Sequence, residues 1–426
     1  MSKRLLLVFV IGFFLTGWFS SCSDNDDPGS KENKVTVKFS AVPAVEGTLD
    51  MAYFEGMKAV FTEVRNQEKT ECLLDNTGVG MVSLNKGTYN VALEEKVKNK
   101  QGDPVVVSVR IENFSVNEDG QEIIGKANTL PESALGKGFI FSEIFFNGET
   151  NARMMHPDQY FVIFNPTSED LYADGLCIAP TNQPSAWEKE MWYDKYYPTQ
   201  VPIMGFITIP GNGKEHLVKA GEKLVIAFTA INHNTEDKPN SVDLSGADFE
   251  IYTGPDSELF GKDVDNPEVP NVLVTHNPES FVGGFYFHPR GFYAPLMFKL
   301  ENGEKATVEK FYKDNLSKAQ QLVPADEEAG TPASTIEVTI LSVPTDMILD
   351  GVQTGLKNYL KTRAIPESVD RGAFLVSGCH RQELAIRKEI LVGDRVFYQD
   401  TNNSDEDFVL DRKGQNAFPV GWRDKK

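Results

Sequence analysis

Hydrophobic side chains recur at every second position in most apolar segments of this chain. In VTVKF (residues 35–39), Val35, Val37 and Phe39 alternate with polar residues, and VVVSVRI (residues 105–111) continues the same pattern. A period of two places successive side chains on opposite faces of a β-strand, so these segments predict half-buried strands. Spacing typical of helices occurs at residues 307–321 and 351–363, where we expect one or two short helices. The predicted fold class is therefore all-β.

Cysteines contribute little to the expected stability of this fold. Besides Cys22, the chain has Cys72, Cys177 and Cys379, none of them in a C-x-x-C pair. Three cysteines cannot form a full disulfide framework, so the core must rest on apolar burial. A single disulfide between Cys177 and Cys379 remains open, because a sequence does not show which thiols are close in space.

The first 33 residues have the pattern of an exported lipoprotein. Residues 1–21 predict a signal peptide, because a basic start precedes an apolar run, Leu5 to Trp18, that is shorter than the roughly 20 residues of a membrane span. The following Phe19-Ser20-Ser21-Cys22 resembles a bacterial lipobox, with Phe19 in place of the usual leucine. We therefore expect acylation of Cys22. Cleavage near the two serines without acylation is the alternative.

Acylation explains why a cysteine follows the apolar run. Each buried methylene contributes about 0.8 kcal/mol, so two or three acyl chains anchor a protein stably. Residues 22–33 form an acidic tether, and its Asp24, Asp26 and Asp27 resemble the signal that Bacteroidota use to export lipoproteins to the outer face of the outer membrane. The expected location is the outer membrane, lipid-anchored and facing the exterior. The alternative is a solvated linker that is merely acidic.

The charge of the chain excludes some partners. The formal net charge is -20, and loss of Lys3 and Arg4 with the signal peptide lowers it to -22. Such a negative chain is unsuited to nucleic acid, whose phosphates require cationic surfaces. It is equally unsuited to direct adhesion to anionic membrane surfaces.

Residues 34–128 predict a first β-sandwich module. Two apolar runs surround Asn85-Lys86-Gly87, which predicts a short hairpin with Gly87 in a left-handed conformation. The segment DNTGVGMVSLNKGTYNVAL resembles transthyretin-like modules of envelope proteins, and the size of the region fits an immunoglobulin-like sandwich. The turn-rich residues 127–138 predict a domain boundary.

Residues 138–426 resemble lamin-tail domains, which are immunoglobulin-like β-sandwiches. The resemblance rests on four segments, namely Ile140 to Ile144, Asp158 to Pro166, Gly221 to Ile226 and Asp400 to Phe408. Val162 stands where an acid is usual, and Gly175-Leu176 lacks the usual tryptophan. Insertions at about residues 181–210 and 253–335 interrupt the pattern. As a whole, the chain resembles a Bacteroidota outer-membrane lipoprotein family of unknown function.

Motifs for catalysis or metal binding are missing from the sequence. There is no G-x-S-x-G elbow, GNGKEH (residues 211–216) lacks the spacing of a phosphate-binding loop, and the six histidines form no H-x-H or H-E-x-x-H. QDTNNSDEDF (residues 399–408) lacks the glycine and terminal glutamate of an EF-hand, so we interpret it as a polar turn. Cys379 and His380 would point to opposite faces of a strand. We predict no enzyme activity, no metal and no cofactor.

Aromatic residues in the insertions are the candidate ligand-binding residues. Rings presented by loops offer a large apolar area at low entropy cost, which suits a glycan or small molecule. The candidates are Trp187, Trp192, Tyr193, Tyr196, Tyr197, Tyr286, Phe292 and Tyr293. The alternative is that these rings pack against the sheet and cover one of its edges.

Three hypotheses for function follow. The first is a non-catalytic surface lipoprotein that binds a ligand or partner and serves an outer-membrane nutrient transporter. The second is a structural or adhesive envelope protein that contacts other surface proteins. The third, an extracellular hydrolase, draws only on the abundant acids and the exported location.

Overall fold

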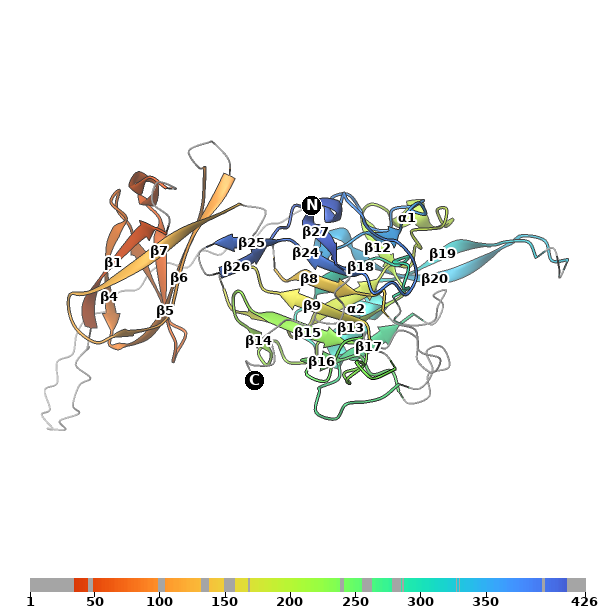
Figure 1. Cartoon of the computed structure of the whole chain (residues 1–426), viewed down its shortest axis with the longest axis horizontal. Helices are drawn as coiled ribbons and strands as arrows, with labels where there is room; N and C mark the ends of the chain where they lie inside the picture. The colour runs from red at the N-terminus through yellow and green to blue at the C-terminus, as the bar shows by residue number, and fades with distance from the viewer. Residues whose placement is uncertain are drawn as a thin grey trace, which may run out of the picture.

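The computed structural model describes residues 34–44, 49–98, 104–131, 138–148, 158–167, 169–237, 241–254, 263–277, 285, 287–326, 328, 330–392 and 395–411. The chain is mostly β, with several sheets and few short helices, which confirms the predicted predominance of strands. A smaller N-terminal module lies beside a larger second body (Figure 1). The predicted signal peptide, the tether and Cys22 lie outside the described residues.

Seven strands build the N-terminal module, in the order β3-β2-β5-β6-β7-β1-β4. Their bounds are β1 (Lys34–Pro43), β2 (Lys58–Glu63), β3 (Lys69–Leu73), β4 (Val79–Asn85), β5 (Gly87–Lys98), β6 (Pro104–Val116) and β7 (Gln121–Pro131), with the 3-10 helix η1 at Met51–Phe54. Strand β7 pairs first with β1 and then, through its last residues, with β6. One hydrophobic cluster receives side chains from all seven strands, including the alternating Val35, Val37 and Phe39.

The hairpin predicted around Gly87 is wrong. Strand β4 pairs with β1, whereas β5 pairs with β2 and β6, so the chain turns a corner between strands that are not neighbours. Gly87 does not have a positive φ. A Cβ at this position would instead lie 3.2 Å from Oε1 of Glu63, so the side chain of Glu63 comes close to the backbone of Gly87.

A six-stranded sheet in the second body contains three of the four segments that resemble lamin-tail domains, whereas the fourth, Asp400 to Phe408, is a turn and a short helix that enter its last strand. Its order is β16-β15-β9-β8-β24-β27. The strands are β8 (Ile140–Phe145), β9 (Tyr160–Phe164), β15 (Lys223–Ala227), β16 (Phe249–Glu250), β24 (Leu384–Arg387) and β27 (Phe408–Asp411). Segments that are far apart in sequence therefore meet in one sheet.

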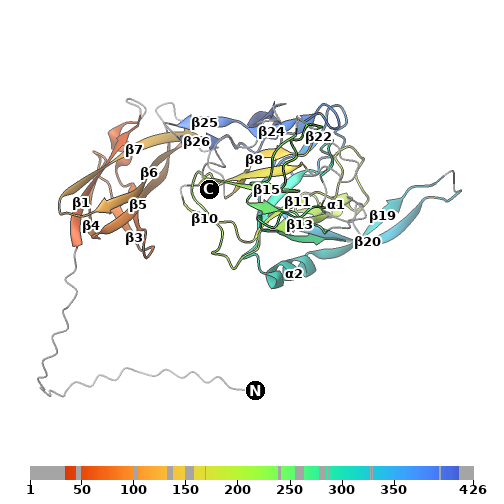
Figure 2. The same cartoon turned by 60° about the horizontal axis from the view of Figure 1, so that its bottom comes forward.

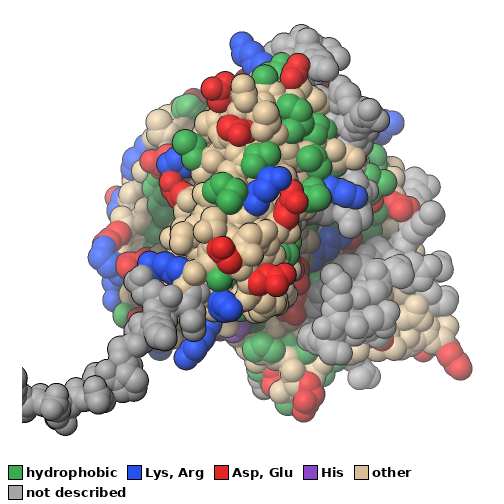
Figure 3. All heavy atoms as spheres, turned by 90° about the vertical axis from the view of Figure 1, so that its left-hand side faces the viewer, with side chains coloured by type: hydrophobic (Ala, Val, Ile, Leu, Met, Phe, Trp, Pro, Cys, Tyr) green, Lys and Arg blue, Asp and Glu red, His purple; other side chains and the backbone are tan. Residues whose placement is uncertain are grey.

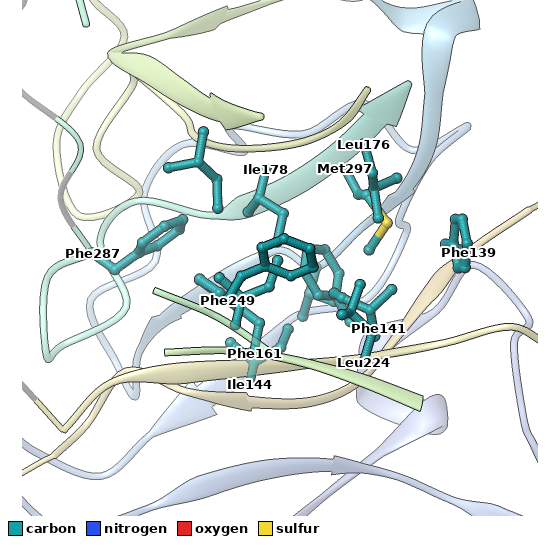
Figure 4. Packing of buried hydrophobic residues seen from close by; sticks show 14 of the residues in the cluster. Phe139, Phe141, Ile144, Phe161, Leu176, Ile178, Leu224, Phe249, Phe287 and Met297 are labelled. Atoms are coloured by element: carbon teal, nitrogen blue, oxygen red, sulfur yellow. The ribbon is translucent and has the colours of Figure 1, made fainter. Parts of the chain in front are cut away.

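A five-stranded sheet packs against the first one. Its order is β17-β13-β11-β18-β21, with β11 (Leu176–Pro180), β13 (Gly205–Thr208), β17 (Leu273–His276), β18 (Pro295–Lys299) and β21 (Ile348–Gly351). Figure 4 shows the core between them, where Phe141 and Phe161 face Ile178 and Met297. The ring centroids of Phe141 and Phe161 are 5.7 Å apart. This apolar layer stabilises the scaffold on which the loops are displayed.

A long β-hairpin projects from the second body. It is formed by β19 (Leu316–Val323) and β20 (Ser334–Pro344), and the base of β20 also pairs with β12 (Gln200–Ile203). Both views show the hairpin extending away from the sheets (Figures 1 and 2). The remaining elements are α1 (Tyr193–Tyr196), α2 (Lys305–Asp314), α3 (Ser404–Asp407), η3 (Thr345–Met347), β10 (Leu171–Tyr172), β14 (Leu217–Val218), β22 (Thr354–Leu356), β23 (Phe374–Val376), β25 (Glu389–Val392) and β26 (Arg395–Tyr398).

Of the two predicted helices, the first forms in part and the second does not form. Helix α2 occupies the first part of residues 307–321, but the chain then becomes strand β19. Residues 351–363 are not helical: Thr354–Leu356 forms β22, which pairs in parallel with β23. Gly351 and Gly355 weaken a helix here, and Oε1 of Gln353 accepts the backbone N–H groups of Ala364 and Ile365, which fixes a non-helical path.

The structure places the three cysteines of the described regions. Cys72, Cys177 and Cys379 are free thiols, so the disulfide left open by the sequence is not formed. Cys379 lies in a turn after β23 rather than in a strand, and His380 beside it has a φ of 54°.

In the described part of the chain, every helix is too short or too polar for a bilayer span.

Candidate functional site

Three of the predicted ligand-binding rings pack against one face of the projecting hairpin. Trp192, Tyr193 and Tyr196 are buried in a cluster with Ala319, Val338 and Ile340 of β19 and β20. The hydroxyl oxygen of Tyr196 lies 2.6 Å from Oγ of Ser317, and the hydroxyl of Tyr193 donates to the carbonyl of Arg363 at 2.7 Å. Packing against the sheet, the alternative drawn from the sequence, describes these three side chains.

Trp187 is the large ring of this loop that reaches solvent. Its side chain is 40% exposed. Its backbone carbonyl accepts a hydrogen bond of 2.7 Å from Oγ1 of Thr362, and the carbonyl of Ser185 accepts the N–H groups of Lys361 and Thr362. The loop that carries Trp187 is therefore tied to residues 361–362 by three hydrogen bonds.

The segment tied to Trp187 carries a second exposed ring. Tyr359 is 58% exposed and lies two residues before Lys361. Nζ of Lys361 is 3.2 Å from Oε1 of Glu188, which bridges the two segments at the surface. We call the exposed side chains of these two joined segments, Trp187, Glu188, Tyr359 and Lys361, the aromatic surface. Tyr359 is not among the predicted ligand-binding residues, since a helix was expected at residues 351–363, whereas it lies in a turn after β22.

The other predicted rings lie in or beside this region. Tyr197 is half-buried and stacks on Tyr193, with ring centroids 4.8 Å apart. Phe292 stacks on His288 at 4.6 Å, and its carbonyl accepts the N–H of Ser185 at 2.8 Å. Burial, together with the charge of Glu190, raises the pKa of the buried Tyr293 to about 12. Tyr286 lies outside the described residues.

A buried asparagine organises a neighbouring loop that no sequence motif indicated. The amide nitrogen of Asn147 donates to the carbonyls of Pro289 and Gly378, and its oxygen accepts the N–H of Arg381 at 2.6 Å. Because the side chain is fully buried, these bonds fix residues 378–381 next to His288. Burial lowers the pKa of His288 to about 4, assisted by the charges of Arg290 and His380.

Two acids of the polar turn at residues 399–408, Asp400 and Asp407, point inward, whereas Asp405 and Glu406 are exposed. Oδ1 of Asp400 accepts a 3.0 Å hydrogen bond from Arg387, and Oδ2 of Asp407 accepts the backbone N–H groups of Thr401 and Asn403. These two carboxylates therefore shape the turn, which leads into β27. A different group, Asp174, Glu215 and His216, has ligand atoms close enough together to hold a metal ion.

Side chains of different types are mixed on the exposed end of the N-terminal module. Figure 3 looks onto this end, where hydrophobic, acidic and basic side chains are interspersed. The exposed Met81 and Ile124 lie on strands flanking Lys38, which forms a 3.0 Å ion pair with Glu122. Isolated apolar side chains of this kind are normal on a protein surface.

Comparisons with known proteins support a shared fold. A family model described as "Protein of unknown function (DUF4876)" matches residues 219–414. No curated protein matches the chain by sequence. A crystal structure of a DUF4876 family protein from Bacteroides thetaiotaomicron is 18% identical, with a TM-score of 0.52, over 88% of this chain and 94% of that chain.

Two further crystal structures match more weakly. A DUF3823 family protein from Parabacteroides merdae is 10% identical over 35% of this chain and 67% of that chain, with a TM-score of 0.16. A "putative carbohydrate binding protein" from Bacteroides uniformis is 11% identical over 73% of this chain and 98% of that chain, also with a TM-score of 0.16. The chain thus has the fold of the Bacteroides thetaiotaomicron DUF4876 family protein, and its residues 219–414 match the model of that family.

Proposed function

We propose that this chain is a non-catalytic lipoprotein of the outer membrane, anchored through Cys22, whose β-rich body faces the exterior and binds a ligand for a nutrient transporter. The signal peptide, the lipobox and the acidic tether support the location. Two immunoglobulin-like sandwiches, the second lamin-tail-like, are the finer fold assignment that goes with this proposal. The sheets then act as a rigid support for loops that make contacts.

The ligand we propose is a glycan, bound at the aromatic surface. The observation that carries this assignment is the exposed Trp187, held by backbone hydrogen bonds next to the segment of Tyr359. Exposed rings stack on the apolar faces of sugars, while charged groups such as Glu188 and Lys361 accept and donate hydrogen bonds to hydroxyls. A site whose loop is already fixed loses little entropy on binding.

A glycan-binding measurement tests this site. The purified protein should bind members of a panel of polysaccharides, and Trp187→Ala and Tyr359→Ala should each weaken binding at least about ten-fold, the effect of losing about 1.4 kcal/mol. Tyr172→Ala is the matched control, since Tyr172 is an exposed ring on β10. Unchanged binding in both site variants, or an equal loss in the control, would remove the aromatic surface from the proposal.

The anchor is tested separately. A palmitate analogue fed to cells should label the protein, and Cys22→Ala should abolish labelling and release the protein from membranes. Equal labelling of the Cys22→Ala variant would exclude acylation at this residue. Surface exposure is then read from digestion by an external protease in intact cells.

The projecting hairpin favours an adhesive role as the second candidate. Ala319, Val338 and Ile340 on one hairpin face are covered by the aromatic cluster, but Ile336, two positions further out on this face, is 46% exposed. An apolar stripe that continues into solvent suits contact with another surface protein. Cross-linking from Ile336 in intact cells to one constant protein neighbour, with glycan binding absent, would favour this candidate.

A further inference from the structure

Asp174 is a buried carboxylate enclosed by the loop of residues 210–216. It precedes β11, and the loop connects β13 with β14. Its Oδ2 accepts the backbone N–H groups of Glu215 at 3.1 Å and His216 at 3.0 Å. Gly211 has a φ of 127°, and a Cβ there would overlap Oδ1 of Asp174, so only glycine lets the loop close over the carboxylate.

His216 presents a ring nitrogen to the same carboxylate. Its Nδ1 lies 3.3 Å from Oδ1 of Asp174. The ring is half-buried and packs edge-on against Phe249, with centroids 5.0 Å apart, which fixes its orientation. The carboxylate of Glu215 faces solvent, and one ligand atom from each of the three side chains lies within 4.8 Å of the others. The three groups therefore lie close enough together to hold an ion once their side chains adjust.

We propose that Asp174, Glu215 and His216 form a zinc site. Two ligands that are each about 2.0–2.1 Å from zinc and separated by a tetrahedral angle lie about 3.3 Å apart. This is the distance between Nδ1 of His216 and Oδ1 of Asp174. The backbone N–H groups on Asp174 and the ring of Phe249 orient the ligands as outer groups do in metal sites.

The surroundings select the type of ion. Nζ of Lys299 donates to the backbone carbonyl of Asp174 at 2.9 Å rather than to its carboxylate. An imidazole with two carboxylates suits zinc, whereas calcium requires six to eight oxygen ligands. Water would complete the coordination, and the ion would fasten the loop to the turn before β11.

Calorimetry with the full chain, purified in a non-ionic detergent and stripped of metal with a chelator, tests the site with ZnCl2 as the probe. We expect one zinc ion per chain. His216→Asn and Glu215→Gln should each weaken zinc binding at least about ten-fold. His276→Asn is the matched control, because His276 is an exposed histidine on another strand. Cobalt added in place of zinc should give visible absorption that is lost in His216→Asn.

Asp174→Asn is not the primary variant, since Asp174 also holds the loop. Glu215 is exposed, so Glu215→Gln keeps the fold while removing a ligand charge. Absence of zinc binding by the stripped protein, equal affinity in His216→Asn, an equal loss in His276→Asn or a preference for CaCl2 would each overturn the assignment. The proposed glycan site is independent of this result, because it uses other residues.

Discussion

Nη2 of Arg387 donates a 2.6 Å hydrogen bond to Oδ2 of Asp350, and both side chains are buried. Nε donates to the carbonyl of Phe141 at 2.7 Å, and Nη1 donates to Asp400. Oδ2 of Asp407 lies 3.8 Å from the same guanidinium. One cation therefore joins strands β8, β21 and β24 to the turn before α3.

Arg387→Leu should be strongly destabilising. The substitution leaves the carboxylates of Asp350, Asp400 and Asp407 without their shared cation, and loss of one partner of a buried ion pair costs about 3–5 kcal/mol. Urea unfolding followed by fluorescence measures the loss. Arg371→Leu, at an exposed arginine, should change the free energy of unfolding by less than about 0.5 kcal/mol. Equal stability of both variants would contradict the role of Arg387.

Glu143 should make stability depend on pH. Burial raises its pKa from 4.5 to about 7, against the opposing charge of Lys223 and a 3.4 Å hydrogen bond from Tyr160, while the charge of Glu389 adds to the rise. The folded chain therefore holds this proton more tightly than the unfolded chain. Its stabilising contribution is complete below about pH 4.5 and is lost as the pH rises through about 7.

Glu143→Gln isolates this effect, because glutamine imitates the neutral acid. The variant should match the original protein near pH 4.5 and exceed its stability by up to about 3 kcal/mol at pH 8, since one pKa unit corresponds to about 1.4 kcal/mol. Urea unfolding at several pH values gives the comparison, with the exposed Glu94→Gln as control. A stability difference independent of pH would contradict the burial of a neutral Glu143.

The two tryptophans of one loop should respond differently to substitution. Trp192→Ala removes a buried ring from the cluster under the hairpin and should cost about 3–5 kcal/mol. Trp187→Ala removes an exposed ring and should leave the free energy of unfolding within about 0.5 kcal/mol. Thermal and urea unfolding measure both. A large loss in Trp187→Ala would make it a structural residue, and the glycan proposal would then lose its main support.

Asn147→Ala should destabilise the loop that contains Cys379 and His380. The carbonyls of Pro289 and Gly378 and the N–H of Arg381 would lose their buried partner, and each such group costs about 1–3 kcal/mol. We expect a loss of at least about 3 kcal/mol and faster amide exchange at residues 378–381. Asn117→Ala, at an exposed asparagine, should change neither quantity.

Local pattern predicted the strands well and their pairing poorly. The alternation of Val35, Val37 and Phe39 gave the strand and its buried face, because the period of two depends only on neighbouring residues. The corner at Gly87 could not be distinguished from a hairpin, since β4 pairs with β1 and β5 pairs with β2, and both partners lie well before Gly87 in the sequence. Residues 351–363 have helical spacing, but the tertiary bonds of Gln353 determine their path.

The candidate sites depended even more on tertiary contacts. Sequence reasoning selected Trp187 but could not separate it from Trp192, because exposure differs only once the hairpin covers one ring. In both sites the residues come from distant segments. Hydrogen bonds join the segment of Tyr359 to the loop of Trp187, and the loop of His216 closes over Asp174. The spacing of GNGKEH argued against a phosphate-binding loop, and it carried no signal for the carboxylate of Asp174, 42 positions before His216.

The hairpin of β19 and β20 packs on the ring of Trp192 and its neighbours, which belong to the same loop as Trp187. Because one loop supports the hairpin and also carries the exposed ring of the proposed glycan site, we expect a partner bound to the hairpin to change the affinity for the glycan.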